Sequence, residues 1–170
     1  MKKINNYELK DWLCEVRDKL KPHTIYYGIG KDKDVIEDGV SRADVLRWHT
    51  YGNPIQQLPK RDAMIEPVKN RQGEIIKVFL NVFDLISHEK DPVKRASEMS
   101  GRWLVLNCVK KTIMASGFGK WKKLSKRTIE NKQAKGTASN PILVDTGTMI
   151  NCIDNYIDEK LTKNNKIGNM

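Results

Sequence analysis

Apolar positions recur at helical spacing along three stretches of the chain. Residues 6–20, 75–86 and 92–114 each place apolar side chains three and four positions apart, so each stretch is expected to form a helix with one buried face. The residues that the third helix is expected to bury are Ala96, Met99, Trp103, Leu106, Val109 and Ile113. Gly101 lies inside this helix, where glycine costs about 1 kcal/mol relative to alanine unless another element packs closely there.

Capping residues predict two shorter helices. Ser41 can cap a helix over residues 42–51, and Gly52 suits the end of that helix because glycine readily adopts the conformations that stop one. Ser125 can cap a further helix over residues 126–134.

Two stretches indicate β-structure in a chain dominated by helix. Residues 23–30 are rich in β-branched and aromatic side chains and contain glycines at their end, which is typical of a strand. Ile153 and Ile157 belong to the last regular element, a short strand or helix. Residues 53–61 carry two prolines and no periodicity, which predicts an extended, partly exposed loop. Long helices beside few strands predict an α+β fold, with a small mixed or antiparallel sheet packed with several helices and with extended loops.

The composition fits a single domain without a membrane segment. Its 170 residues can bury a core of their own, so residues 1–170 are expected to form one domain that ends in a polar tail at about 160–170. The longest apolar-rich run, residues 75–86, is too short and too polar to span a bilayer, and the first residues lack the apolar centre of a secretory signal. We therefore expect a soluble protein with no membrane partner.

The sequence contains no recognisable catalytic or metal-binding pattern. Its three cysteines form no Cys-x-x-Cys pair, so neither a disulfide framework nor a zinc site is expected. His23, His49 and His88 are scattered, and none has an aspartate or cysteine partner at a useful spacing. Catalytic groups that are remote in sequence could still meet in the fold. The sequence nevertheless favours a protein that is not an enzyme and that uses no cofactor or metal.

The triplet Asp145-Thr146-Gly147 has the sequence found in aspartic proteases. It occurs only once here, so a protease would have to pair the carboxylates of two copies of the chain. A turn explains the triplet more simply, because Asp145 can accept hydrogen bonds from downstream amides and Gly147 permits a positive φ.

A basic run lies between residues 120 and 135. Seven lysines and arginines face a single acid there, and the net charge of the chain is +10, which permits attraction to nucleic acid or to acidic protein surfaces. Trp121 could stack on a base, or Trp121 and Leu124 could anchor a solvated helix face in the core. The candidates for contact with DNA or an acidic partner are Lys122, Lys123, Lys126 and Arg127. The candidates in this run for contact with a neighbouring subunit are Lys132 and Lys135.

The proline-rich loop before residue 62 holds further candidates for a subunit interface, Gln57, Pro59 and Arg61. Arginine makes forked hydrogen bonds to carboxylates and is frequent at the centres of interfaces. Arg61 could therefore bridge to the next subunit, or it could form a salt bridge within its own chain.

Two blocks of the sequence resemble a known family. They are WHTYGNPIQQLPKRDAMIEP (residues 48–67) and WKKLSKRTIENKQAKGTASNPILVDTG (residues 121–147). In this order they are similar to the virion-morphogenesis family of tailed bacteriophages, the tail-completion or tail-terminator proteins of the neck, and the resemblance covers residues 25–157. The positions that carry it are Trp48, Gly52, Trp121, Leu124, Thr128, Asp145, Thr146 and Gly147. The chain departs from the family after Arg61, where the family often continues with Pro-Phe.

The resemblance implies a structural virion protein that assembles in the cytoplasm of a host bacterium and resides in the neck of the particle. Such a subunit is small and α+β, and it forms a ring with itself, expected to be a hexamer. The ring caps the tail tube protein and joins it to the head connector or stopper protein, with non-specific contact to DNA that passes through its lumen. No catalytic cycle and no cofactor are implied. The alternatives are a head-completion (stopper) protein and a small basic nucleic-acid-binding protein.

Overall fold

The computed structural model describes residues 23–37, 39–137 and 139–157. The helix predicted for residues 6–20 and the polar tail at 160–170 lie outside these residues. In chain order the elements are β1 (Ile25–Ile29), β2 (Ile36–Glu37), β3 (Val40–Ser41), α2 (Arg42–Tyr51), α3 (Ile65–Asn70), α4 (Gln72–Ile86), α5 (Pro92–Leu104), the π-helix η1 (Val105–Lys110), α6 (Lys111–Met114), the 3₁₀ helix η2 (Ser116–Gly119), α7 (Lys126–Ala134), α8 (Thr148–Cys152) and β4 (Ile153–Ile157). The predicted α+β class is confirmed.

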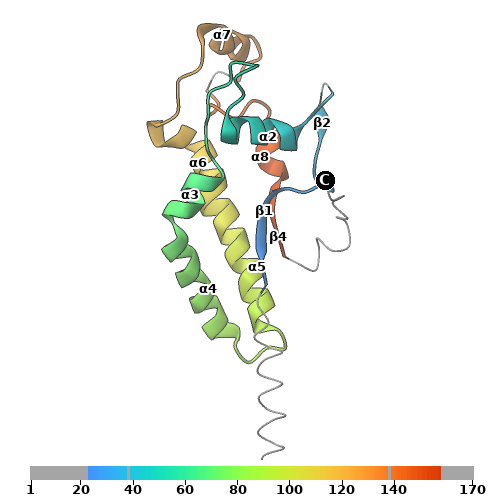
Figure 1. The fold of residues 1–170 in the computed structure, drawn as a ribbon, viewed down its shortest axis with the longest axis vertical. Coiled ribbons are helices and arrows are strands. Elements are labelled where there is room, and N and C mark those ends of the chain that lie inside the picture. Colours follow the sequence, from blue (N-terminus) through green and yellow to red (C-terminus); the bar gives the residue numbers. More distant parts are fainter. Residues whose placement is uncertain (1–22, 38, 138, 158–170) are drawn as a thin grey trace, which may run out of the picture.

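A helical hairpin projects from the rest of the molecule. Figure 1 shows α4 and α5 side by side, with α2, α7 and α8 gathered beyond the end of the hairpin where α3 and α6 lie. The strands β1 and β4 run along α5 and pair antiparallel, from Ile25 opposite Ile157 to Ile29 opposite Ile153. The sequence predicted a small mixed or antiparallel sheet. The sheet is antiparallel and is built from the two ends of the described chain, and β2 and β3 form a second two-stranded ladder.

The sheet lies very close to α5 at Gly101. A methyl group at this position would lie 2.7 Å from Asn155 Nδ2 and 2.9 Å from Ile25 Cγ2. Both distances are below van der Waals contact, so only glycine allows β1 and β4 to approach the helix here. Close packing by another element, the condition under which a glycine is useful inside this helix, is therefore met at Gly101.

The predicted helix over residues 92–114 is continuous but not uniformly α-helical. It runs through α5, the π-helical segment η1 and α6. Ala96, Val109 and Ile113 are fully buried as predicted. The prediction is wrong for Met99 and Leu106, which are 48% and 52% exposed. Among the described elements, the helix packs against α4 on one side and against the strands on another, so these elements leave a third face open.

Trp103 occupies an intermediate position on the same helix. It is half-buried, and the Arg71 guanidinium lies over its ring, 5.0 Å from the ring centroid. This is the geometry of a cation–π contact. It fastens the start of α4 to α5.

The predicted caps of the shorter helices are confirmed. Ser41 Oγ accepts a hydrogen bond from the Asp44 amide at 3.2 Å, and Ser125 Oγ accepts one from the Thr128 amide at 3.2 Å. Gly52 ends α2 with a φ of 81°.

The segment between α2 and α4 differs from the prediction. Residues 53–61 do not form an extended loop, because Asn53 and Leu58 exchange backbone hydrogen bonds of 2.9 and 2.8 Å that close a tight turn. The short helix α3 then follows. Its start is organised by the Asp62 carboxylate, which accepts hydrogen bonds from the amides of Met64 and Ile65.

The core sits where α2, α8, β4 and the long helix meet. Its fully buried members are Leu46, Ala63, Leu104, Val105, Val109, Ile113, Met149 and Ile153. Burying an aliphatic side chain of this size stabilises a fold by about 1.5–3 kcal/mol. By contrast, no residue of α4 is fully buried. None of the helices in the described ranges is long and apolar enough to cross a membrane.

Candidate functional site

Most of the residues singled out from the sequence lie in one segment, residues 116–148. It leaves the long helix, passes through α7 and returns to α8 beyond the end of the hairpin, as Figure 1 shows. Trp121, Leu143 and Val144 pack against the core and hold the segment in place. The predicted anchoring of Trp121 in the core is confirmed.

The segment begins with a left-handed turn. The φ angles are 49° at Ser116, 69° at Gly117, 52° at Phe118 and 79° at Gly119. Residues other than glycine rarely adopt this region. The Trp121 ring covers Gly117 so closely that a methyl group there would lie 2.5 Å from the ring. Ser116 Oγ accepts a hydrogen bond from the Ile142 amide at 3.0 Å. These contacts hold the turn, and they leave Phe118 61% exposed.

Arg61 joins the preceding loop to this segment within the same chain. Its side chain is 5% exposed, its amide donates to the His49 carbonyl at 2.7 Å, and its Nη2 donates to the Lys122 carbonyl at 3.3 Å. Burial lowers the pKa of its guanidinium below the ordinary value. In the described ranges no carboxylate lies within ion-pair distance of it. The structure thus gives the Arg61 guanidinium a carbonyl partner in its own chain and, among the described residues, no salt bridge.

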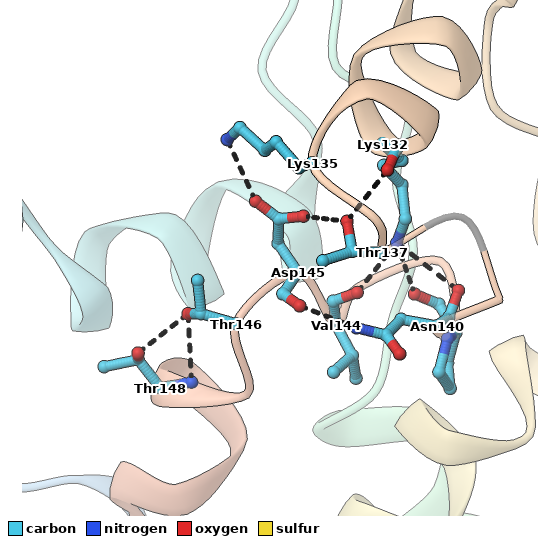
Figure 2. A network of polar contacts seen from close by, with 9 residues as sticks. Lys132, Lys135, Thr137, Asn140, Val144, Asp145, Thr146 and Thr148 are labelled. Atoms are coloured by element: carbon cyan, nitrogen blue, oxygen red, sulfur yellow. Dashed lines mark hydrogen bonds and ion pairs between the residues drawn. The ribbon is translucent and has the colours of Figure 1, made fainter.

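Lys132 is enclosed by the loop that follows α7. Figure 2 shows its ammonium group donating to the carbonyls of Asn140, Pro141 and Val144, at 3.3, 3.1 and 2.7 Å. The residue is only 7% exposed, so its three donors are all used within the subunit. The sequence placed Lys132 at a subunit interface, but its side chain points into its own loop.

Asp145 is the second centre of this network. Its carboxylate accepts hydrogen bonds from Thr137 Oγ1 at 2.7 Å and from Lys135 Nζ at 3.2 Å, as Figure 2 shows. The Thr137 hydrogen bond and then Lys135 lower the pKa of Asp145. The prediction that downstream amides would donate to Asp145 is wrong. Because the loop folds back toward α7, the carboxylate is bound by the upstream side chains of Thr137 and Lys135.

The turn that follows Asp145 is held by its own residues. Thr146 Oγ1 accepts a hydrogen bond from the Thr148 amide at 3.4 Å, and the two threonine hydroxyls lie 2.8 Å apart. Gly147 has a φ of 86°, so the predicted positive φ is confirmed.

The other basic candidates are at the surface. The exposed side chains are those of Lys122, Lys123, Lys126, Arg127 and Thr128. Lys135 is also exposed, although it pairs with Asp145. Leu124 and Trp48 are half-buried. In the earlier loop, Gln57 is exposed with a φ of 55°, while Pro59 is half-buried. The candidate residues therefore divide into an internal set that shapes the segment and an exposed basic set that a partner could reach.

The structure adds one half-buried titratable group that sequence reasoning did not single out as functional. His49 lines a cavity of about 310 Å³ between α2, α7 and α8, together with Lys132, Lys135 and Asp145. Burial, and then the charge of Arg61, lower the pKa of His49 to about 4. Its Nδ1 has no hydrogen-bond partner among the described residues.

Within the described residues, no group of three or more His, Cys, Asp and Glu side chains could hold a metal ion. In comparisons with protein-family models, with curated proteins and with solved structures, none matches the chain.

Proposed function

We propose that the chain is a ring-forming structural subunit of a phage neck, a tail-terminator or tail-completion protein that caps the tail tube and joins it to the head connector. The proposal combines the resemblance of residues 48–67 and 121–147 to that family with the surface of the helical hairpin. A subunit that works by assembly needs surfaces that a neighbour covers.

The observation that carries the proposal is the exposure of α4. This helix consists mostly of apolar residues, yet none is fully buried, and Ile76, Leu80 and Leu85 are 58%, 55% and 74% exposed. Only one side of α4 can face α5. A helix that is apolar on several sides is normally covered on each of them. We expect a second copy of the chain to provide that cover.

The exposed face of the long helix supports the same interpretation. Met99, Leu106 and Met114 are each about half exposed on α5, η1 and α6. Single exposed apolar residues are ordinary, but their accumulation on both helices of one hairpin is typical of an interaction surface.

The exposed basic set has a place in this assembly. Lys126 and Arg127 lie on α7, and Lys122 and Lys123 lie in the loop before it. Figure 1 shows α7 beyond the end of the α4–α5 hairpin. In a ring these basic residues would face either the DNA that passes through the lumen or an acidic surface of the tube or connector. Contact with phosphate needs no sequence specificity and would weaken as salt is raised.

The test is a charge placed on α4. Leu80→Asp should keep the subunit monomeric, because a carboxylate cannot be buried unpaired in an apolar interface. The matched control is Asn81→Asp, which puts the same charge on an exposed neighbour in the same helix. Light scattering after size exclusion and negative-stain images should show rings for the native chain and for Asn81→Asp, but single subunits for Leu80→Asp.

The same variants distinguish a neck protein from another kind of oligomer. In a phage that lacks the gene, the native chain and Asn81→Asp should restore joined virions, whereas Leu80→Asp should leave free heads and tails of uncontrolled length. A native chain that stays monomeric, or a deletion that leaves normal virions, contradicts the proposal.

A further inference from the structure

We infer that a groove beside the left-handed turn binds an acidic peptide segment that carries an aromatic or large aliphatic side chain. The groove has a volume of about 550 Å³ and lies between α3, the η1–α6 part of the long helix and residues 117–121. None of the exposed apolar residues of α4 lines it. Peptide binding here therefore goes beyond the proposed ring assembly and does not depend on it.

The apolar part of the groove is presented by a strained backbone. Phe118 has a φ of 52° and projects its ring into solvent, although an L-residue in this region costs about 1–2 kcal/mol. The surrounding contacts enforce this conformation, since Trp121 covers Gly117 and Ser116 binds the Ile142 amide. Residues whose backbone strain is maintained by the surrounding fold are often found at ligand sites. With Pro67 and Trp121, Phe118 offers a surface for an apolar side chain.

The charged rim favours an acidic ligand. Four cations and two acids line the groove: Lys60, Arg71, Lys111 and Lys120, with Asp62 and Glu66. Arg71 is already bound to Glu74, and Lys60 lies 3.6 Å from the Asp62 carboxylate. In the part of the chain that the structure describes, the side chains of Lys111 and Lys120 form no ion pair and no hydrogen bond. These two ammonium groups are free to meet carboxylates of a partner.

A peptide fits the lining better than a nucleic acid strand does. Glu66 is exposed inside the groove, and Asp62 forms part of its wall. A continuous phosphate backbone would pass close to these carboxylates, whereas a peptide can place its acids only beside Lys111 and Lys120. Aromatic anchors with charged neighbours are common at protein interfaces.

The probe is a fluorescein-labelled peptide, Gly-Asp-Glu-Phe-Asp-Glu-Gly, titrated with the full-length protein and followed by fluorescence anisotropy. We expect a Kd of ~100 µM at low salt, weakening as salt screens the charges. A peptide with Ser in place of Phe, and one with Asn and Gln in place of the acids, should each bind at least about tenfold more weakly.

Three protein variants locate the binding. Lys111→Glu with Lys120→Glu should weaken binding at least about tenfold, whereas Lys31→Glu with Lys90→Glu, the same charge change at exposed positions outside the groove, should leave it within about twofold. Phe118→Gly should also weaken binding, while its melting temperature is unchanged or higher because glycine is unstrained at this φ.

Four outcomes would overturn the inference. They are equal losses in the two double-lysine variants, native binding by Phe118→Gly, no anisotropy change with any peptide up to ~1 mM, and tighter binding of a labelled single-stranded DNA octamer than of the peptide. None of them depends on whether the chain forms rings.

Discussion

At the scale of single residues, Lys132 differs most from what its position in the sequence suggests. It belongs to a run of lysines whose other members are exposed, yet it is buried among three carbonyls. A lysine held this way acts as a cross-link between α7 and the loop that leads to α8. The sequence does not distinguish it from Lys135, because its partners are backbone carbonyls that any residue type could carry.

Lys132→Met should therefore destabilise the subunit. The change keeps the length of the side chain but leaves three carbonyls without their donor, which is expected to cost roughly 3 kcal/mol. Lys126→Met, on the exposed side of the same helix, is the matched control and should change the free energy of unfolding by less than about 0.5 kcal/mol. Urea unfolding measures both. Equal stability of the two variants would show that the cage contributes nothing.

His49 should make stability depend on pH. The unfolded chain protonates this imidazole near its ordinary pKa of 6.5, whereas the folded protein does so only at about 4. Between these values the unfolded state holds more protons, so the free energy of unfolding should fall as the pH is lowered from 6.5 to 4. The loss is at most about 3 kcal/mol.

The comparison is between His49→Gln and His88→Gln, since His88 is exposed. In urea unfolding over this pH range, the free energy of unfolding should depend less on pH for His49→Gln, because the contribution of the His49 imidazole is removed. His88→Gln should keep the native slope. Parallel curves for the native chain and His49→Gln would refute the assignment.

At the scale of elements, the sequence predicted the helices and their caps but not all of their surroundings. Periodicity and capping are local properties, so α2, α4 and α7 could be predicted before the structure was known. The exposure of Met99 and Leu106 depends on which sides of α5 receive α4 and the strands, and periodicity does not contain that information. The helix α3 was missed because it has only six residues and contains a proline.

Gly101 offers a test of the contact between sheet and helix. Gly101→Ala would favour the helix locally by about 1 kcal/mol, but its methyl group would overlap Asn155 and Ile25, and such overpacking costs about 1–3 kcal/mol. We expect a net loss of stability. Gly73→Ala, in α4 with no neighbour within 4 Å of the new methyl group, should instead stabilise the protein. In thermal unfolding, the melting temperature should fall for Gly101→Ala and rise for Gly73→Ala. A higher melting temperature for Gly101→Ala would contradict the packing described.

At the scale of the whole molecule, the described residues form a packed end and an open end. The core and the Lys132 network lie where α2, α8 and β4 meet the long helix, whereas the α4–α5 hairpin extends away with apolar side chains exposed. Leu80→Asp is therefore expected to prevent assembly, because Leu80 is 55% exposed and contributes little to the core of its own chain. The sequence predicted an apolar α4, but only the fold shows that the described chain leaves much of it uncovered.

The candidate site was predictable in its anchors and not in its internal bonds. Each anchor has a signature in the local sequence: Trp121 is an isolated aromatic residue, Ser125 is a helix cap and Gly147 is a turn glycine. Each occupies the expected position. Arg61 and Lys132 were expected to meet partners because they are charged. Both instead bind carbonyls within the subunit, and those carbonyls come together only once the loops have folded.

The π-helical segment η1 holds about one residue more than an α-helical turn would. Its hydrogen bonds join residues five apart instead of four, so deleting one residue from Val105–Lys110 and restoring an α-helix would leave everything that follows nearly in place. Ile113 would stay in the core, whereas deleting a residue from the α-helical part would rotate Ile113 and the left-handed turn behind it by about 100°. Related sequences should therefore lose a residue between Gly101 and Gly117 more readily within η1 than outside it.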